Sequence, residues 1–88
     1  MISAEFIAML RCPETRTPLA LADAALLNRI NSEIRAGRLR NRGDQVIAEP
    51  LDGGLVRQDN AMLYPIVRDI PVLLADEGIP LDQLRVEG

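Results

Sequence analysis

The fold of this chain is decided by residues 62–74, which read Met-Leu-Tyr-Pro-Ile-Val-Arg-Asp-Ile-Pro-Val-Leu-Leu. The stretch Met62–Val67 is apolar and rich in residues that favour strands, so we expect a strand there. Arg68 and Asp69 predict a turn directly after it. Ile70–Leu74 then forms the most apolar run of the chain. The stretch therefore predicts a strand, a tight turn and a second apolar segment.

The run Ile70–Leu74 leaves two interpretations open. Successive side chains of a strand point to opposite faces, so five apolar residues in a row cannot all face one core. In one interpretation, the run is a central strand with a helix of the same domain over its second face. In the other, an apolar face or a strand edge is exposed, and a larger protein covers it. The second interpretation assigns to a partner Leu63, Tyr64, Ile70, Pro71, Val72 and Leu73.

Further short strands are expected upstream of residue 62. Asp52-Gly53-Gly54 is a strong turn signal, and Leu55–Arg57 after it reads as a strand. Asp59-Asn60 predicts the hairpin turn that leads into Met62–Val67. Residues 19–22 and 46–47 also suit brief strands. Pro65 cannot donate to a strand ladder, so it is expected at a sheet edge or at a bulge.

Two helices are predicted, and the clearer one covers residues 23–37. Asp23 is a candidate N-cap, and Leu26, Ile30 and Ile34 recur every four residues, which favours an amphipathic helix. Gly37 is a natural stop. A shorter helix is expected near the N-terminus, where Ser3 could cap an apolar stripe at near-helical spacing. That helix should end around residue 11, because Pro13 disfavours helical conformation in the residue before it.

Composition excludes most catalytic equipment. The chain has 88 residues, a formal net charge of −3, no histidine and one cysteine, and all its basic residues are arginine. Ser-His-Asp and Cys-His catalysis, lysine Schiff bases and a self-contained zinc site are therefore excluded. We expect one domain, residues 1–88, that is not an enzyme and carries no cofactor. The acidic balance also argues against nucleic-acid binding through bulk charge.

Location and membrane contact are also predicted from composition. No segment approaches the roughly 20 apolar residues of a membrane span, and the apolar start carries Glu5 and lacks a basic beginning, unlike a signal peptide. A lone cysteine suits a reducing compartment. We therefore expect a cytoplasmic protein without membrane contact.

A group of arginines follows the predicted helix. One interpretation is a solvated helix end, where cations are favourable near the C-terminal dipole. The other is contact with RNA phosphates, supplied in support of an enzyme. The residues concerned are Arg35, Arg38, Arg40 and Arg42.

The order of several short motifs resembles the small zinc-ribbon-like activator subunits of tRNA, rRNA and release-factor methyltransferases, known as the tRNA methyltransferase one-one-two family. The resemblance includes its short bacterial relatives of unassigned role and covers about half of the chain. The motifs are Leu10-Arg11-Cys12-Pro13, Thr17-Pro18-Leu19, Gly54-Leu55-Val56, Tyr64-Pro65-Ile66 and Ile70-Pro71-Val72-Leu73-Leu74.

This sequence departs from the family at the metal site. Zinc-binding members have a second cysteine three residues after the first and another pair near the hairpin. Here Thr15 and Arg57 stand at such positions, and Cys12 is the only thiol. A structural zinc site needs about four thiolate or imidazole ligands, so no zinc is expected. Cys12 is then expected to be a small buried hydrophobic residue.

The resemblance implies a fold and a function. The expected fold is α+β: a small, mainly antiparallel sheet of hairpins, metal-free and zinc-ribbon-like, with an N-terminal helix and an inserted amphipathic helix at 23–37. The implied function is that of a non-catalytic module that binds and activates a class I S-adenosylmethionine-dependent methyltransferase of the translation machinery. Family activators do this by adding a strand to the partner's sheet. The alternative is a self-standing or homodimeric housekeeping protein without such a partner.

Overall fold

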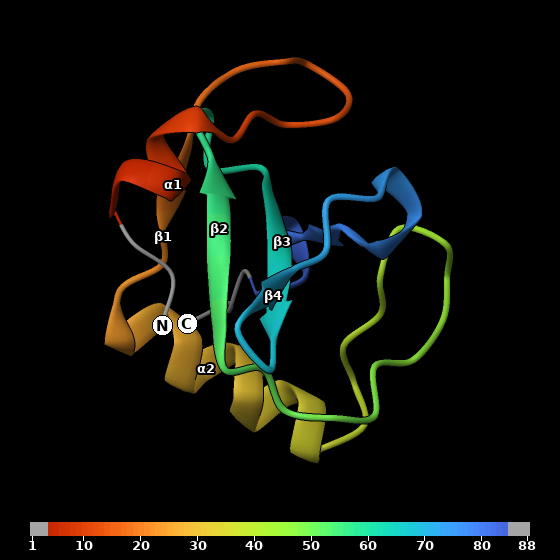
Figure 1. Ribbon diagram of the computed structural model, residues 1–88. Helices are drawn as coiled ribbons and strands as arrows, with labels where there is room; N and C mark the ends of the chain where they lie inside the picture. Colours follow the sequence, from red (N-terminus) through yellow and green to blue (C-terminus); the bar gives the residue numbers. More distant parts are fainter. Residues whose placement is uncertain (1–3, 85–88) are drawn as a thin grey trace.

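The computed structural model describes residues 4–84 and confirms an α+β fold built on an antiparallel sheet (Figure 1). The order of the strands is β1-β2-β3-β4, and β5 pairs with β3 as well. The elements are α1 (Ala4–Met9), β1 (Leu19–Leu21), α2 (Ala24–Arg35), β2 (Gly53–Arg57), β3 (Met62–Val67), β4 (Ile70–Pro71), the 3₁₀ helix η1 (Ala75–Glu77), β5 (Ile79–Pro80) and the 3₁₀ helix η2 (Leu81–Leu84). None of the helices in this described part is long and apolar enough to cross a membrane.

Two hairpins organise the sheet. The first joins β2 to β3 and confirms the turn predicted at residues 59–60. The second joins β3 to β4 through Arg68 and Asp69, whose φ angles are 53° and 63°. Positive φ at both central residues is the signature of the type I′ turn, whose twist matches that of the flanking strands. The predicted turn is therefore confirmed at the residues expected.

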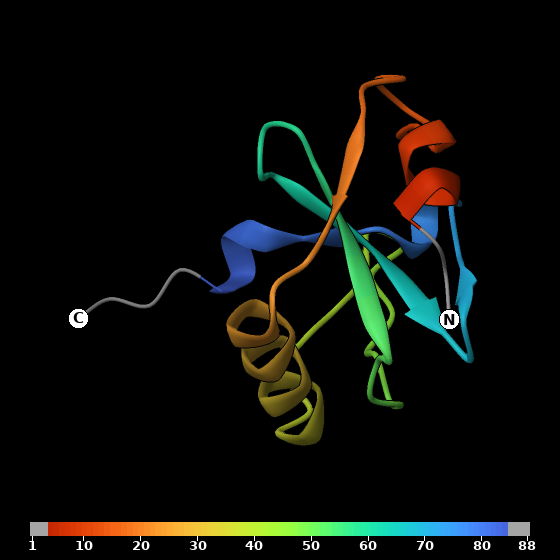
Figure 2. The same cartoon turned by 60° about the vertical axis from the view of Figure 1, so that its left-hand side comes forward.

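The sheet separates two apolar layers, with α2 on one face and α1 on the other (Figure 2). Alternation along β3 produces this separation, because Leu63 points towards α2 whereas Tyr64 points towards α1. The layer under α2 contains Ile30, Ile34, Leu39, Leu51, Val56, Leu63, Ile79 and Leu84. The layer under α1 contains Ile7, Cys12, Leu19, Leu55, Met62, Tyr64 and Ile66.

The predicted amphipathic helix is confirmed as α2. The Asp23 carboxylate accepts a hydrogen bond from the Leu26 N–H at 2.8 Å, which satisfies one of the free donors of the first turn. Ile30 and Ile34 are buried on the inner face. The chain leaves the helix at Gly37, whose φ of +73° is readily accessible to glycine. The shorter N-terminal helix is also present, although its expected cap, Ser3, lies outside the described residues.

The run Ile70–Leu74 does not form a long strand, which corrects the expectation of a central strand there. Only Ile70 and Pro71 belong to β4, and the chain then turns into η1. The strand expected at residues 46–47 is reduced to an isolated bridge between Arg40 and Val46. After η1 the described chain continues through β5 and η2. Local apolar composition did not decide between strand and loop in these segments.

The sequence predicts Pro65 at a sheet edge or at a bulge, but the residue lies in β3, an interior strand of the sheet. Its C=O accepts from Val72 N–H at 2.9 Å, so its nitrogen also faces the side of β4 and β5. On that side β4 pairs with residues 66–67 and β5 with residues 62–63, which leaves a gap in the ladder. A proline is tolerated there because no ladder donor is required at that point.

Candidate functional site

The structure buries two of the residues assigned to a partner. Leu63 and Tyr64 are 0% exposed, so the prediction that they contact a partner is wrong. Strand β3 is covered on both faces, which sequence periodicity did not reveal. Ile70 is 63% exposed, whereas Pro71, Val72 and Leu73 are half-buried. The predicted site is therefore divided between the core and the surface.

The outer edge of β4 is blocked to strand addition. Val72 N–H donates to Pro65 C=O, so the backbone of the preceding residue, Pro71, points away from β3. Proline carries no N–H, and β4 has only two residues. Natural sheets protect their edges with short strands and prolines of this kind.

The outer edge of β5 follows the same rule. Leu81 N–H donates to Ala61 C=O at 2.9 Å, so the neighbouring residue Pro80 points its nitrogen outward. Strand β5 also has only two residues. Both strands on this side of the sheet thus offer a partner strand little to bind.

The outer edge of β1 is open. Ala22 N–H donates to Gly54 C=O at 2.8 Å, so Ala22 and Ala20 point their backbone groups towards β2. The N–H and C=O of Leu21 therefore point away from the sheet. Among the described residues, only the isolated bridge between Arg11 and Pro18 covers this side, and it reaches no further than the start of β1.

Exposed apolar side chains lie beside this open edge. Phe6 and Met9 of α1 are 41% and 72% exposed, and Leu21 of β1 is 58% exposed. Helix α1 packs on β1, and Leu21 points to the same face of the sheet as α1, since it alternates with Ala20 as Leu19 does. We call Phe6, Met9, Leu21 and the outward backbone of β1 the α1–β1 surface.

Sequence reasoning did not find the α1–β1 surface. The sequence predicts an apolar stripe at near-helical spacing near the N-terminus, and α1 buries Ile7 of it but leaves Phe6 and Met9 exposed. The available signal was the presence of two apolar stripes on so short a helix. The stripe formed by Phe6 and Met9, which are three residues apart, faces away from the core because Ile7 occupies the core side of the helix.

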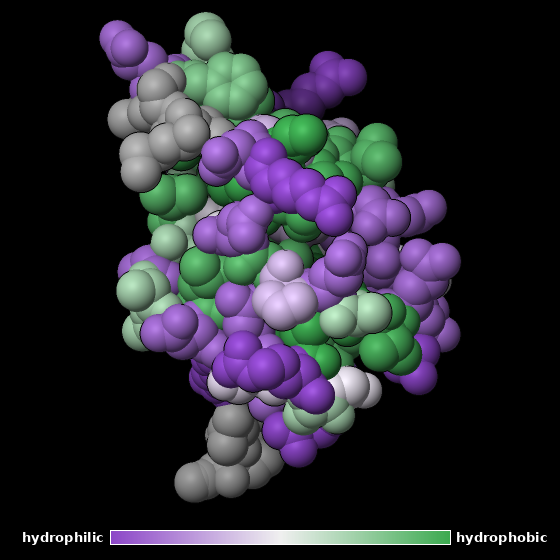
Figure 3. All heavy atoms as spheres, turned by 60° about the horizontal axis from the view of Figure 1, so that its bottom comes forward, coloured by the Kyte–Doolittle hydropathy of each residue, from purple (hydrophilic) through white to green (hydrophobic). Residues whose placement is uncertain are grey.

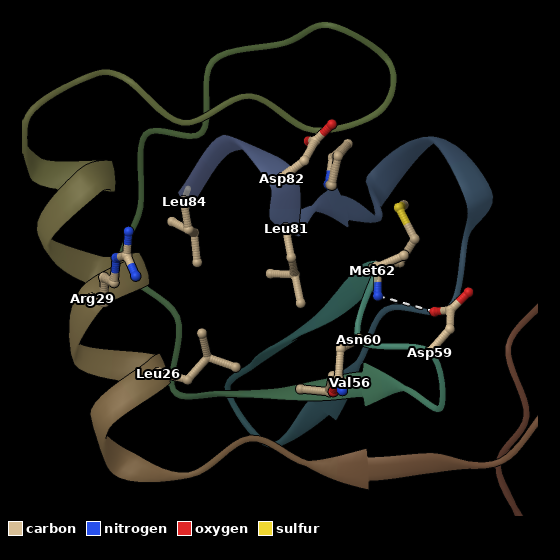
Figure 4. Close-up of a pocket in the computed structure, with 11 residues that line it drawn as sticks. Leu26, Arg29, Val56, Asp59, Asn60, Met62, Leu81, Asp82 and Leu84 are labelled. Carbon is tan, nitrogen blue, oxygen red and sulfur yellow. Dashed lines mark hydrogen bonds between the residues drawn. The ribbon is translucent and has the colours of Figure 1, made fainter. Parts of the chain in front are cut away.

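An apolar groove opens on the other side of the molecule. It has a volume of about 770 Å³ and lies between α2, the β2–β3 hairpin and η2 (Figure 4). Leu26, Val56, Leu81 and Leu84 supply apolar walls, while Arg29 stands on the α2 side and Asp82 on the η2 side. Figure 3 shows hydrophobic and hydrophilic side chains interspersed on the face nearest α2. The apolar surface there is confined to small areas.

A polar cluster surrounds Cys12. The Cys12 thiol and the Tyr64 hydroxyl lie 3.0 Å apart, and Cys12 is 1% exposed, as expected for this residue. Thr15 and Arg57 lie near enough to the thiol to lower its pKa. Arg57 binds Asp59 through two hydrogen bonds of 2.8 Å. The described residues contain no group of three or more His, Cys, Asp or Glu that could hold a metal ion.

The hydrogen bonds of this cluster set the ionisation of the thiol. Burial by itself raises the pKa of Cys12, but hydrogen bonds from Thr15, Tyr64 and Arg57 outweigh it and lower the pKa to about 7. Burial and the neighbouring thiol raise the pKa of Tyr64 to about 12. The thiolate is thus favoured and the phenolate disfavoured at the same place.

We predict that the stability of the protein rises between about pH 7 and pH 9. In this window the folded state holds Cys12 as thiolate while the unfolded thiol stays protonated, so unfolding takes up a proton. The gain should be on the order of 1–2 kcal/mol and should disappear as the pH falls through 7. Urea unfolding at several pH values measures it. Cys12→Ala is the control, and parallel pH profiles of the two proteins would contradict the prediction.

The arginine group is largely neutralised by its own neighbours. Arg38 makes two hydrogen bonds to Glu33, of 3.0 and 2.9 Å. Arg40 donates to the Asp44 C=O at 2.9 Å and lies 3.5 Å from its carboxylate, and Arg42 pairs with Glu14. Each of these three side chains therefore has an acidic neighbour. Contact with RNA phosphates would require breaking pairs that already exist.

Comparison with known proteins supports the fold. No protein-family model and no curated protein matches the chain. The chain is similar to the solution NMR structure of XF2673 from Xylella fastidiosa, with a TM-score of 0.75 and 28% sequence identity over 94% of this chain and 86% of that one. This likeness supports the α+β architecture along nearly the whole chain.

Proposed function

We propose that this protein is a non-catalytic binding module that docks on a larger protein through the α1–β1 surface. The observation that carries the proposal is the contrast between the sheet edges. Prolines close β4 and β5, whereas the β1 edge is open beside exposed Phe6, Met9 and Leu21. An extended segment of a partner can bond to such an edge while its side chains contact the apolar surface next to it.

The class of partner follows from the resemblance to the methyltransferase activators. One structural feature supports that resemblance: the positions where the family carries zinc ligands converge here. Thr15 and Arg57, which stand at two of these positions, both lie near Cys12 and lower the pKa of its thiol. We therefore propose a metal-free, zinc-ribbon-like domain whose partner is a class I S-adenosylmethionine-dependent methyltransferase of the translation machinery. In this proposal the methyl donor and the chemistry belong to the partner, as the resemblance implies.

Affinity purification from a native lysate tests this proposal. We expect a class I methyltransferase to be recovered at near-equal stoichiometry. Recovery of the chain alone, or only with further copies of itself, would favour the alternative of a self-standing or homodimeric protein.

We predict that Leu21→Pro reduces recovery of the methyltransferase at least tenfold, the equivalent of about 1.4 kcal/mol. The substitution removes an N–H that points away from the sheet, so the domain itself loses no ladder hydrogen bond. Leu21→Ala is the matched control, because it removes the side chain and keeps the N–H. Its effect should be clearly smaller.

Two further measurements make the outcome specific. Melting curves should show that Leu21→Pro stays folded. Ile70→Asp, at a site 63% exposed on β4, should leave recovery unchanged. A loss of recovery with Ile70→Asp but not with Leu21→Pro would place the partner on the β4 segment and contradict docking at β1.

A further inference from the structure

The apolar groove and helix α1 both present apolar side chains at the surface. The groove is a hollow of about 770 Å³ with walls formed by Leu26, Val56 and Leu81. Helix α1 is a short ridge from which Met9 and Phe6 project, with Met9 72% exposed. Side chains three residues apart on a helix lie on one face, so both can enter one hollow together. A single chain thus carries both an apolar ridge and an apolar hollow.

The charges at the two features also correspond. Arg29 stands on the α2 wall of the groove and Asp82 on the η2 wall, and no ion pair within residues 4–84 involves either (Figure 4). The ridge has Glu5 at its beginning and Arg11 just after its end. A ridge laid along the groove can therefore place Glu5 near Arg29 and Arg11 near Asp82. The reverse direction would oppose like charges.

The positions of the two features exclude contact within one molecule. Helix α1 covers one face of the sheet, and the groove lies on the other side with α2 and η2 (Figure 2). A ridge can reach a groove only on another copy. The contact is then head to tail, and such a contact forms chains or rings rather than a simple two-fold dimer.

We infer that a second copy of this chain inserts Phe6 and Met9 of its α1 into the groove. This contact hides part of the α1–β1 surface, so self-association and docking on a larger protein exclude each other. This mutual exclusion rests on the proposed function, whereas the self-association does not. The contact area of a two-residue ridge is below that of stable interfaces, so the association is weak and visible only at high protein concentration.

Complementation between two blocked variants tests the inference. Met9→Glu disables the ridge, and Ala61→Arg fills the groove from an exposed position on its wall. For the natural chain, we expect the mass from sedimentation equilibrium to rise above 9.7 kDa as the protein concentration increases. For each variant alone, the mass should remain that of the monomer, 9.7 kDa. An equimolar mixture should form a species of twice that mass, because one intact ridge and one intact groove remain.

Charge exchange tests the direction of the contact. Arg29→Glu should weaken the self-association at least fivefold, and the double change Arg29→Glu with Glu5→Arg should restore most of it. A monomeric natural chain at millimolar concentration, or a mixture of the blocked variants that stays at 9.7 kDa, would overturn the inference.

The same variants separate this inference from the proposed function. Ala61→Arg should still recover the methyltransferase, because the α1–β1 surface is intact. If Ala61→Arg recovers the methyltransferase and the complementation fails, the self-association is wrong and the proposed function stands. If complementation succeeds and no methyltransferase is recovered, the self-association stands and the proposed function is wrong.

Discussion

Leu63→Ala is expected to lower the free energy of unfolding by about 3 kcal/mol, within the range for large-to-small substitutions at fully buried sites. Leu63 is 0% exposed in the central strand and packs in the layer under α2. Removal of three carbons leaves a cavity that the sheet cannot close, because β3 is paired on both sides. A domain of 88 residues has a small stability margin, so a large fraction of the Leu63→Ala variant should be unfolded at moderate temperature.

Ile70→Ala is the matched control for Leu63→Ala. Ile70 is also an apolar strand residue and lies in β4, which pairs with β3, but its side chain is 63% exposed. Its truncation should change stability by less than about 0.5 kcal/mol, as for surface substitutions generally. Urea unfolding followed by circular dichroism compares both variants. Equal losses in the two variants would mean that the Ile70 side chain is as buried as Leu63, which contradicts the structure.

Gly54→Ala is expected to be destabilising by about 2 kcal/mol, although alanine normally stabilises a chain relative to glycine. A Cβ at this position would lie 2.7–2.9 Å from three side-chain carbons of Leu63. Leu63 is fully buried and cannot move away. Gly53→Ala in the same strand is the control, since its Cβ would meet Ile66 at ordinary distances of 3.5 and 3.7 Å.

The double variant Gly54→Ala with Leu63→Ala gives a sharper test. Loss of the Leu63 side chain removes the three atoms that the new Cβ would contact. The double variant should therefore lose less free energy of unfolding than the two single variants lose in sum, with a coupling energy of about 1–2 kcal/mol. Additive losses would show that Gly54 is required for another reason, such as its backbone conformation.

The local elements were accessible from sequence because local chemistry decides them. Helix α2 has a side-chain cap, a four-residue apolar period and a terminal glycine, and all three signals act within the same fifteen residues. The β3–β4 turn could be predicted from the charged pair Arg68-Asp69 between two apolar segments, although positive φ is uncommon for arginine. The expected burial of Cys12 is confirmed, but its hydrogen bond to Tyr64 and its lowered pKa show that it is a polar group and not simply a small hydrophobic residue.

The candidate site was not accessible in the same way. Leu63 and Tyr64 resemble surface residues of a strand as much as core residues until it is known that helices cover both faces of β3. The paired state of Arg38, Arg40 and Arg42 depends partly on contacts with Glu14, which lies far away in the sequence. The open edge of β1 depends on the direction in which each backbone group points, and the strand registers decide that direction.

Composition and neighbouring residues were enough to predict the lack of histidine and lysine chemistry, the two helices and the turns at residues 59–60 and 68–69, whereas the α+β class was implied by the family resemblance. Tertiary structure alone decided which apolar residues are core and which are surface, and which sheet edge is open. The physical reason is that burial and strand pairing are properties of segments that meet in space. A proline nitrogen or a leucine side chain has the same local chemistry whether it faces a neighbouring strand or water.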